Sequence, residues 1–530
     1  MKRVRNFLST MWRKNSLSPQ WFYPLSWLFL VIFYFFSRLY QLLILPVFAD
    51  EAIYIYWAQL ALSDWGRYSF YPLNDGKTPL FIWLLIPMLK IFTQPLLAGR
   101  LLSVFFGLAQ LFLQIKLAAF FMSKKKYQLL AGLLLLVLPG FIFNQRLSLM
   151  DSALTFFLTL SFYFTLKAGK QLTNAPKENI WMKDAILAGV CLALSLWTKF
   201  SALIFLPVLL TSWWFFIPLK KDFFRQLFKQ QLPLAIHWLM LLCLTVAIGM
   251  LGFYSLKISP SFSQIFVRGG DFLYSGREFL ASPLAILTRN AMFAAQVLSN
   301  YAGGLFLFLT CFISLLLVKK NSQPLLLLLS GLLLLAPIVI LGKQIYSRYF
   351  LPVLPFLILS FTLGLSHLNM SRYVKVFLVT VISAMGIIFN LTAVTKPEQL
   401  PLLPADQGQY LTQWSAGYGI VEVLSLLEQQ FSYQNTLVLT EGHIGTLPDG
   451  LQIYLAAHPQ RNYWRVEGVG QPVRLGNLQK FANLIAQYPR VILVVNSDRL
   501  AIDNLLADQL LATYKRPLPQ TASLQVWQLK

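Results

Sequence analysis

The sequence predicts an α-helical polytopic membrane protein that ends in a small α/β domain. Of the 530 residues, 57% are hydrophobic and only 12% are charged, whereas a soluble domain has about 25% charged residues. Many apolar runs have the length of roughly 20 residues that a helix needs to cross a bilayer. After residue 395 these long runs stop, and short apolar stretches alternate with amphipathic ones.

The chain begins with a basic tail, residues 1–20, followed by an apolar run over 21–47 that is too long for a signal-peptide core. We therefore predict an uncleaved first span with a cytoplasmic N-terminus. The pattern gives about 11 to 13 membrane helices in residues 21–395. The predicted spans are 21–47, 98–121, 127–144, 150–167, 184–199, 201–217, 233–255, 299–318, 324–342, 349–366 and 375–394.

The connectors between these spans set the orientation. The net charge is +24, and all of the excess lies before residue 396, because residues 396–530 hold equal numbers of acidic and basic residues. Basic connectors then face the cytoplasm, and the loops 48–97 and 256–298 face outward. Residues 79–93 are apolar but short and contain Pro87, so we predict a re-entrant or interfacial helix there. The charge distribution excludes a nucleic-acid-binding face.

Residues 396–530 form the predicted outer domain. Strands are expected at 436–440, 491–496 and 524–529, and helices at 419–431, 451–458, 475–488 and 501–514. Short all-apolar strands between helices are typical of a mostly parallel sheet. The stretch EGHIGTLPDG directly follows the first strand, where ligands gather in open α/β sheets. Glu441 and His443 are therefore possible acceptor contacts, although an ordinary strand-to-helix loop is the favoured explanation.

Two adjacent acids, Asp50 and Glu51, directly follow the first span, and Lys77 closes the same loop. Acids beside a membrane span are costly to keep and usually serve a function. The aromatic residues of this loop suit the headgroup layer. We interpret the loop as part of the active site of a membrane-embedded enzyme.

The order of several short motifs resembles a known family. After the Asp-Glu pair come KTPL (77–80), an Arg-x-x-Ser-x-x-x-Gly segment from Arg100, and a second acid in MDSALTFFLTLSFYF (150–164). WTKFSAL (197–203) and RYFLPVLP (348–355) follow. This order is similar to that of the GT-C glycosyltransferases, in the branch of protein O-mannosyltransferases and lipid A aminoarabinose transferases. The resemblance covers about residues 20–395, and it implies the GT-C fold.

The resemblance implies transfer of a sugar from a polyprenyl-phosphate donor to an acceptor hydroxyl on the outer face, with inversion. Asp50 would be the general base, Glu51 its partner, and Asp151 a second acid that shapes the sugar or acceptor site. A carboxylate is a suitable base for a hydroxyl. Asp50 and Asp151 each precede a predicted helix, so an N-cap is the alternative role of both.

The resemblance also implies cations for the departing phosphate. Lys77 matches the lysine of the family motif, although Thr78 stands where the family usually has proline. Arg348 and Tyr349 begin a span from the outer side, and Arg100 is a further candidate that instead pairs with an acid if it is structural. The alternative for Lys77 is an interfacial lysine that reaches toward water. Lys199 interrupts an apolar stretch, which marks either a loop or a functional group.

No cofactor is certain. Asp50, Glu51 and Asp151 offer the hard oxygen ligands that a divalent cation takes, so such a cation is possible. The three cysteines, Cys191, Cys243 and Cys311, show neither metal spacing nor a disulfide framework.

Two other function classes compete with the transferase. A lipid or glycan transporter would also be polytopic, but we find no related halves of the kind many transporters show. A scaffold protein would leave the Asp-Glu loop and Lys77 unexplained. The expected partners are the polyprenyl-phosphate donor, membrane lipids and a lipid, glycan or protein acceptor, and the expected location is a bacterial inner membrane.

Overall fold

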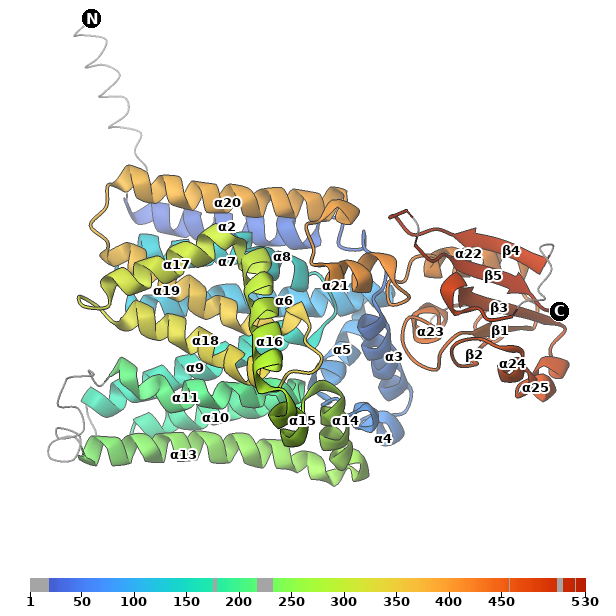
Figure 1. The fold of residues 1–530 in the computed structure, drawn as a ribbon, viewed down its shortest axis with the longest axis horizontal. Coiled ribbons are helices and arrows are strands. Elements are labelled where there is room, and N and C mark those ends of the chain that lie inside the picture. Colours follow the sequence, from blue (N-terminus) through green and yellow to red (C-terminus); the bar gives the residue numbers. More distant parts are fainter. Residues whose placement is uncertain (1–18, 175–178, 217–231, 457, 503–508, 520) are drawn as a thin grey trace, which may run out of the picture.

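The computed structural model describes residues 19–174, 179–216, 232–456, 458–502, 509–519 and 521–530. Figure 1 shows a bundle of long helices lying side by side, with a small sheet domain at one end of the bundle. The shorter helices α3 (Ala49–Ser63), α4 (Trp65–Tyr68) and α5 (Leu80–Ile91) lie at that end, close to the sheet domain. A helical membrane part followed by a small α/β domain is therefore confirmed.

Helices of very unequal length build the membrane part. Within the described residues, seven helical stretches are long and apolar enough to cross a membrane, and three shorter apolar helices accompany them. The principal helices are α2 (Pro19–Leu39), α6 (Pro95–Phe121), α7 (Lys125–Val137), α9 (Met150–Asn174), α10 (Trp181–Thr198), α13 (Leu232–Tyr254), α16 (Pro283–Leu298), α17 (Gly304–Leu317), α18 (Gln323–Leu341), α19 (Leu354–His367) and α20 (Arg372–Thr395).

Two predicted spans are interrupted. The span predicted over 127–144 breaks at Pro139, where α7 ends and α8 (Pro139–Asn144) begins. Leu138 is extended there, at φ −70° and ψ 127°, because a proline disfavours helical geometry in the residue before it. The span predicted over 201–217 consists of three short pieces, η2 (Phe200–Phe205), α11 (Leu206–Thr211) and η3 (Ser212–Phe215).

The predicted outer loop 256–298 is largely helical, which corrects its boundaries. It holds η4 (Ser255–Ile258), η5 (Pro260–Ser263), α14 (Gln264–Phe272), α15 (Gly276–Ala281) and all of α16. The π-helical turn η6 (Ser299–Gly303) joins α16 to α17, so residues 283–317 form one long helical stretch. Arg289 and Asn290 interrupt the apolar pattern of α16 without interrupting the helix. The end of the outer loop was therefore predicted too late in the chain, at residue 298.

Helix α5 covers most of the stretch whose crossing was in question. Its 12 residues reach about 18 Å at 1.5 Å per residue, which is short of a hydrocarbon core of about 30 Å. It packs against α3, α6 and α10. This length fits an interfacial or re-entrant helix better than a full span.

The outer domain is a five-stranded sheet with the strand order β2-β1-β3-β5-β4. Strand β1 (Thr436–Thr440) pairs in parallel with β2 (Trp464–Gly468) and β3 (Arg490–Asn496), whereas β5 (Leu524–Gln528) is antiparallel to β3 and to β4 (Leu510–Tyr514). The accompanying helices are α22 (Ile420–Gln430), α23 (Asp449–Leu455), α24 (Leu475–Gln479) and α25 (Ala482–Gln487).

The sheet is thus mixed rather than mostly parallel. The helix predicted over 501–514 is wrong for residues 510–514, which form β4, while residues 503–508 lie outside the described residues. Pairing with β5 decides the conformation of this segment, as tertiary context commonly does for short strands. Strand β2 was missed, because its segment WRVEG mixes charged and apolar residues.

Candidate active site

Four segments that are distant in the sequence meet where the bundle approaches the outer domain. They are the first turn of α3, the first turn of α9, the residue after α10, and the 3-10 helix η7 (Ser347–Val353). They contribute Asp50, Asp151, Lys199 and Arg348. Phe48 is the extended N-cap residue of α3, at φ −88° and ψ 152°. Asp50 lies in the first helical turn, where a negative charge is favoured, and is not the N-cap.

The charged side chains form a continuous chain of contacts. Arg348 donates from Nη2 to Oδ2 of Asp50 at 2.6 Å, and its Nε lies 3.8 Å from Oδ2 of Asp151. The other oxygen of Asp151 accepts from Nζ of Lys199 at 2.8 Å. One guanidinium therefore lies between two carboxylates, and a lysine completes the row.

Exposure differs along this row. The side chains of Asp50 and Lys199 are each 21% exposed, whereas those of Arg348 and Asp151 are 8% and 3% exposed. Among the described residues, Nη1 of Arg348 is buried without a hydrogen-bond partner. A buried unpaired donor is costly, so this nitrogen is suited to an oxygen of a bound ligand.

The surrounding charges set the protonation of Asp50. Burial alone would raise the pKa of this carboxyl, but the positive charges of Arg348, Lys77 and Lys199 outweigh burial and hold the pKa below its ordinary value. Asp50 is therefore a carboxylate at neutral pH. While Arg348 remains bound to it, it is a weaker base than a free aspartate.

Lys77 lies beside this row, between an acid and two aromatic rings. Its Nζ contacts Oδ2 of Asp75 at 2.9 Å and lies 5.6 and 5.5 Å from the ring centroids of Tyr54 and Trp57. Asp75 also pairs with Arg268 of α14 at 2.9 Å. Lys77 thus lies in a partly exposed aromatic setting, close enough to affect the charge of Asp50.

Tyr349 follows Arg348 directly and interacts with the lysine of the row. The Nζ atom of Lys199 lies 4.2 Å from the centroid of the Tyr349 ring. The ring also packs edge-on against Tyr346, and the side chain is partly exposed. Tyr349 therefore forms one wall of the charged row.

Glu51 and Arg100 are brought together away from this row, and this corrects the roles expected for both. Arg100 donates from Nε and Nη2 to the two carboxylate oxygens of Glu51, at 2.9 and 2.8 Å. Its remaining donors go to the carbonyl oxygens of Leu42, Leu45 and Pro46. Neither side chain is more than 1% exposed. Arg100 has no donor left for a phosphate.

The Glu51 carboxylate also accepts from the backbone N–H groups of Phe48 and Ser148, at 3.0 and 2.6 Å. Its Oε1 thus joins α3 to the turn before α9, and its Oε2 caps the N-terminus of α3. The three acids proposed as metal ligands do not form one site, since Glu51 faces Arg100 while Asp50 and Asp151 face Arg348. A guanidinium between two carboxylates does not fit a divalent cation at that position.

Glu441 and His443 lie in the outer domain with different surroundings. Glu441 is buried and accepts from the backbone and side chain of Asn496, each at 2.7 Å, and from Arg499 at 3.3 Å. It ties the end of β1 to the end of β3, so the structure explains it as a structural residue rather than an acceptor contact. His443 is exposed beside Gly470.

Two residues of the site were not among the predicted site residues. Lys199 was noted only as a charge that interrupts an apolar stretch, and the structure places it on Asp151. Asp406 is buried behind Arg348, where it accepts from Ser347. Its sequence context, PADQ, carries no signal of this contact, because 59 residues separate it from Ser347.

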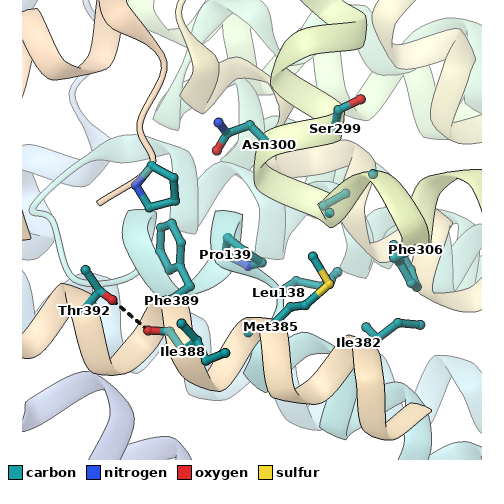
Figure 2. Close-up of a pocket in the computed structure, with 15 residues that line it drawn as sticks. Leu138, Pro139, Ser299, Asn300, Phe306, Ile382, Met385, Ile388, Phe389 and Thr392 are labelled. Atoms are coloured by element: carbon teal, nitrogen blue, oxygen red, sulfur yellow. Dashed lines mark hydrogen bonds between the residues drawn. The ribbon is translucent and has the colours of Figure 1, made fainter. Parts of the chain in front are cut away.

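A cavity of about 280 Å³ lies elsewhere, between the α7–α8 break, η6, α17 and α20. Figure 2 shows Ile382, Met385 and Phe389 of α20 on one side and Ser299 and Asn300 of η6 on the other. None of the 15 described residues that line it is charged. Because this cavity offers no charged group, the charged row and not this cavity is the candidate active site.

Comparison with known proteins agrees with this architecture. Residues 73–265 match the family model of the dolichyl-phosphate-mannose-protein mannosyltransferases. The fold is similar to that of ArnT from Cupriavidus metallidurans bound to undecaprenyl phosphate, with a TM-score of 0.57 and 14% identity over 96% of this chain and 98% of that chain.

A second similar structure is the oligosaccharyltransferase AglB from Archaeoglobus fulgidus, in complex with an inhibitory peptide and a dolichol-phosphate. Its TM-score is 0.50 and its identity is 11%, over 91% of this chain and 70% of that chain. No curated protein gives a significant match. The family model matches part of the chain, and the two solved structures show a similar fold.

Proposed function

We propose that this protein is a membrane glycosyltransferase of the GT-C superfamily, and that it transfers a sugar from a polyprenyl-phosphate donor to an acceptor hydroxyl on the outer face of the membrane. The observation that carries the proposal is the pairing of a partly exposed carboxylate, Asp50, with a guanidinium that has one unpaired donor. Proton removal and stabilisation of a leaving phosphate need these two groups side by side.

The comparisons support the donor class. The similar ArnT structure is bound to undecaprenyl phosphate, and the similar AglB structure holds a dolichol-phosphate. Both ligands are polyprenyl phosphates, whose charged head has to be met by cations at the membrane surface. Arg348, Lys199 and Lys77 are the cations grouped around Asp50.

The reaction proceeds in one displacement with inversion. Asp50 takes the proton of the acceptor hydroxyl while the hydroxyl oxygen forms a bond to the anomeric carbon of the sugar. The bond from that carbon to the phosphate oxygen breaks, and the electron pair leaves with the polyprenyl phosphate. Arg348 and Lys77 stabilise the charge that develops on the phosphate. Asp50 returns its proton to water after the product leaves.

Donor binding also activates the base in this proposal. With no ligand bound, Arg348 contacts Asp50 at 2.6 Å and keeps it a weak base. A phosphate draws the guanidinium toward itself, since bidentate pairs with phosphate are among the strong charge-assisted contacts of arginine. Asp50 then regains basicity when the donor is in place, which couples proton removal to substrate binding.

The orientation of the protein is part of the proposal. The α17–α18 and α19–α20 connectors lie at the end of the bundle away from the sheet domain (Figure 1). The first connector carries Lys319 and Lys320, and Arg372 begins α20 directly after the second. Basic connectors mark the cytoplasmic side. The N-terminus then lies in the cytoplasm, the sheet domain outside, and a bacterial inner membrane is the proposed location.

The test is turnover of a radiolabelled polyprenyl-phosphate sugar by purified wild type and by Asp50→Asn. Release of sugar by wild type and a loss of about 10²- to 10⁴-fold in the variant, with lipid binding retained, support the proposal. Asp64→Asn is the matched control, because Asp64 is an exposed acid at the other end of α3. Lipid binding without turnover of any donor by wild type contradicts the transferase and favours a transporter.

A further inference from the structure

The segment that leads from the last membrane helix into the outer domain returns to the charged row. We call residues 404–418 the strap. Its residue Asp406 is 2% exposed and accepts two hydroxyl hydrogen bonds, from Tyr301 at 2.5 Å and from Ser347 at 2.7 Å. Ser347 immediately precedes Arg348. The strap therefore fixes the backbone that carries the guanidinium of the row.

The other half of the strap fixes the chain in front of Asp50. The backbone N–H of Ala49 donates to the carbonyl of Ser415 at 3.0 Å, and the N–H of Gly417 donates to the carbonyl of Val47 at 2.9 Å. These contacts make an antiparallel bridge between the N-terminus of α3 and the strap. The ring of Tyr410 packs on that of Phe48 at 4.7 Å between centroids.

One short segment thus holds both partners of the Asp50–Arg348 pair, although 298 residues separate the partners in the sequence. We propose that Asp406 is a positioning residue of the transferase site, which aligns Arg348 with Asp50 through Ser347 and Tyr301. This inference rests on the proposed function. It makes the entrance to the outer domain a working part of the membrane site.

Substitutions of Asp406 distinguish the effect of its hydrogen bonds from the effect of its charge. Both of its carboxylate oxygens accept from hydroxyl groups, and a hydroxyl is able to donate or to accept. Asn at this position keeps both hydrogen bonds by reversing one of them, whereas Ala keeps neither. Positioning by hydrogen bonds therefore predicts that Asp406→Asn retains function and Asp406→Ala does not.

We call the low-pH side of the pH profile of kcat/KM the acid limb. Its midpoint follows the pKa of Asp50 in the free enzyme, so it reports whether Arg348 is aligned with Asp50. The titratable and charged groups that act on Asp50 from the elements around it are Arg348, Lys77, Lys199, Tyr54, Asp151, Tyr349 and Tyr410. If Arg348 moves away, burial prevails and the pKa of Asp50 rises. A loss of folded protein alone does not move this limb.

The experiment compares the acid limb of wild type, Asp406→Ala, Asp406→Asn and Asp449→Ala. Asp449 is a control of similar burial, 3% exposed, which caps a loop at Gly445 in the outer domain. We expect the midpoint of the acid limb to shift upward by about one pH unit or more in Asp406→Ala. We expect it to stay at the wild-type position in Asp406→Asn and Asp449→Ala.

Tyr301→Phe is the second variant in case Asp406→Ala does not fold, since it removes one hydrogen bond and retains the ring. It should raise the limb in the same direction. An unchanged limb in folded Asp406→Ala or, failing that, in Tyr301→Phe overturns the inference. A shift in Asp406→Asn as large as in Asp406→Ala also overturns it.

Binding of undecaprenyl phosphate to the purified full chain separates this inference from the proposed function. If wild type transfers no sugar, the proposed function fails, and lipid affinity still tests the alignment. We expect Asp406→Ala to bind this lipid about tenfold more weakly than wild type, the effect of one impaired charge-assisted contact. Equal affinities of these two proteins would count against Asp406.

Discussion

Asp50 and Glu51 are neighbours in the sequence with opposite environments. Glu51 is fully buried, bound at both oxygens by Arg100 and by two backbone N–H groups. Asp50 is 21% exposed and bound by an arginine that also faces Asp151. Successive residues of a helix point about 100° apart. The helix therefore directs Glu51 into the bundle and Asp50 toward the charged row.

This difference predicts contrasting outcomes for conservative substitutions of the two acids. Glu51→Gln leaves Arg100 as an uncompensated buried charge, so we expect a loss of about 3–5 kcal/mol in the free energy of unfolding. Asp50→Asn should leave the thermal midpoint close to that of wild type. Thermal unfolding of both variants in one detergent checks this contrast. A stable Glu51→Gln protein would mean that the buried pair is not structural.

The pH dependence of activity in Arg348→Gln tests whether the arginine controls the charge of Asp50. Because Asp50 must be ionised to act as base, activity falls as the pH drops through its pKa. The arginine holds that pKa down, so the acid limb of wild-type kcat/KM should lie below the ordinary aspartate value of about 3.9. Without the arginine, burial should move the limb above that value, with a fall in kcat of about 10²- to 10³-fold.

The pH profiles of wild type and Arg348→Gln, measured with saturating acceptor, decide this point. Arg372→Gln is the control, because Arg372 is an exposed arginine at the start of α20. Superimposable profiles for wild type and Arg348→Gln would contradict the electrostatic role of Arg348.

Lys77→Met should have a smaller effect, expressed in donor binding. A hydrogen bond to a charged group contributes about 1.5–3 kcal/mol, so we expect KM for the donor to rise at least tenfold with a lesser change in kcat. Donor titrations check this, with Lys343→Met as control, since Lys343 is an exposed lysine paired with Glu278. A variant with wild-type KM would assign Lys77 to the membrane interface alone.

Arg268→Ala should have the smallest effect. Its pair with Asp75 is partly exposed, and such pairs contribute at most about 1 kcal/mol. We expect little change in unfolding and a change of about threefold or less in KM. A larger effect in donor titrations would assign a direct substrate contact to α14.

The sequence was sufficient for the fold class, and it singled out three of the charged residues that the structure brings together. Composition and span length determine a membrane bundle, and Asp50, Asp151 and Arg348 are acids or cations placed at span ends, where they need partners. The partner assignments were not predictable, because Arg100 reaches Glu51 across 49 residues and Asp406 reaches Ser347 across 59. Neither contact leaves a local pattern.

Secondary structure was missed for similar reasons. Strand β4 depends on its pairing with β5, which the helix-like stretch 501–514 does not reveal. The break at Pro139 was visible as a proline, but an otherwise continuous apolar run concealed it. Short elements whose conformation depends on distant partners are therefore the part that local patterns left open.

The strap has a consequence for chimeric proteins built by exchanging outer domains. Composition suggests a junction near residue 396, where the apolar spans end. Such a junction would bring in foreign residues at 406, 410, 415 and 417, which contact the chain around Asp50 and Arg348. A junction after Gly419, ahead of α22, keeps these native contacts. A graft that begins there exchanges the sheet domain without changing the contacts around Asp50 and Arg348.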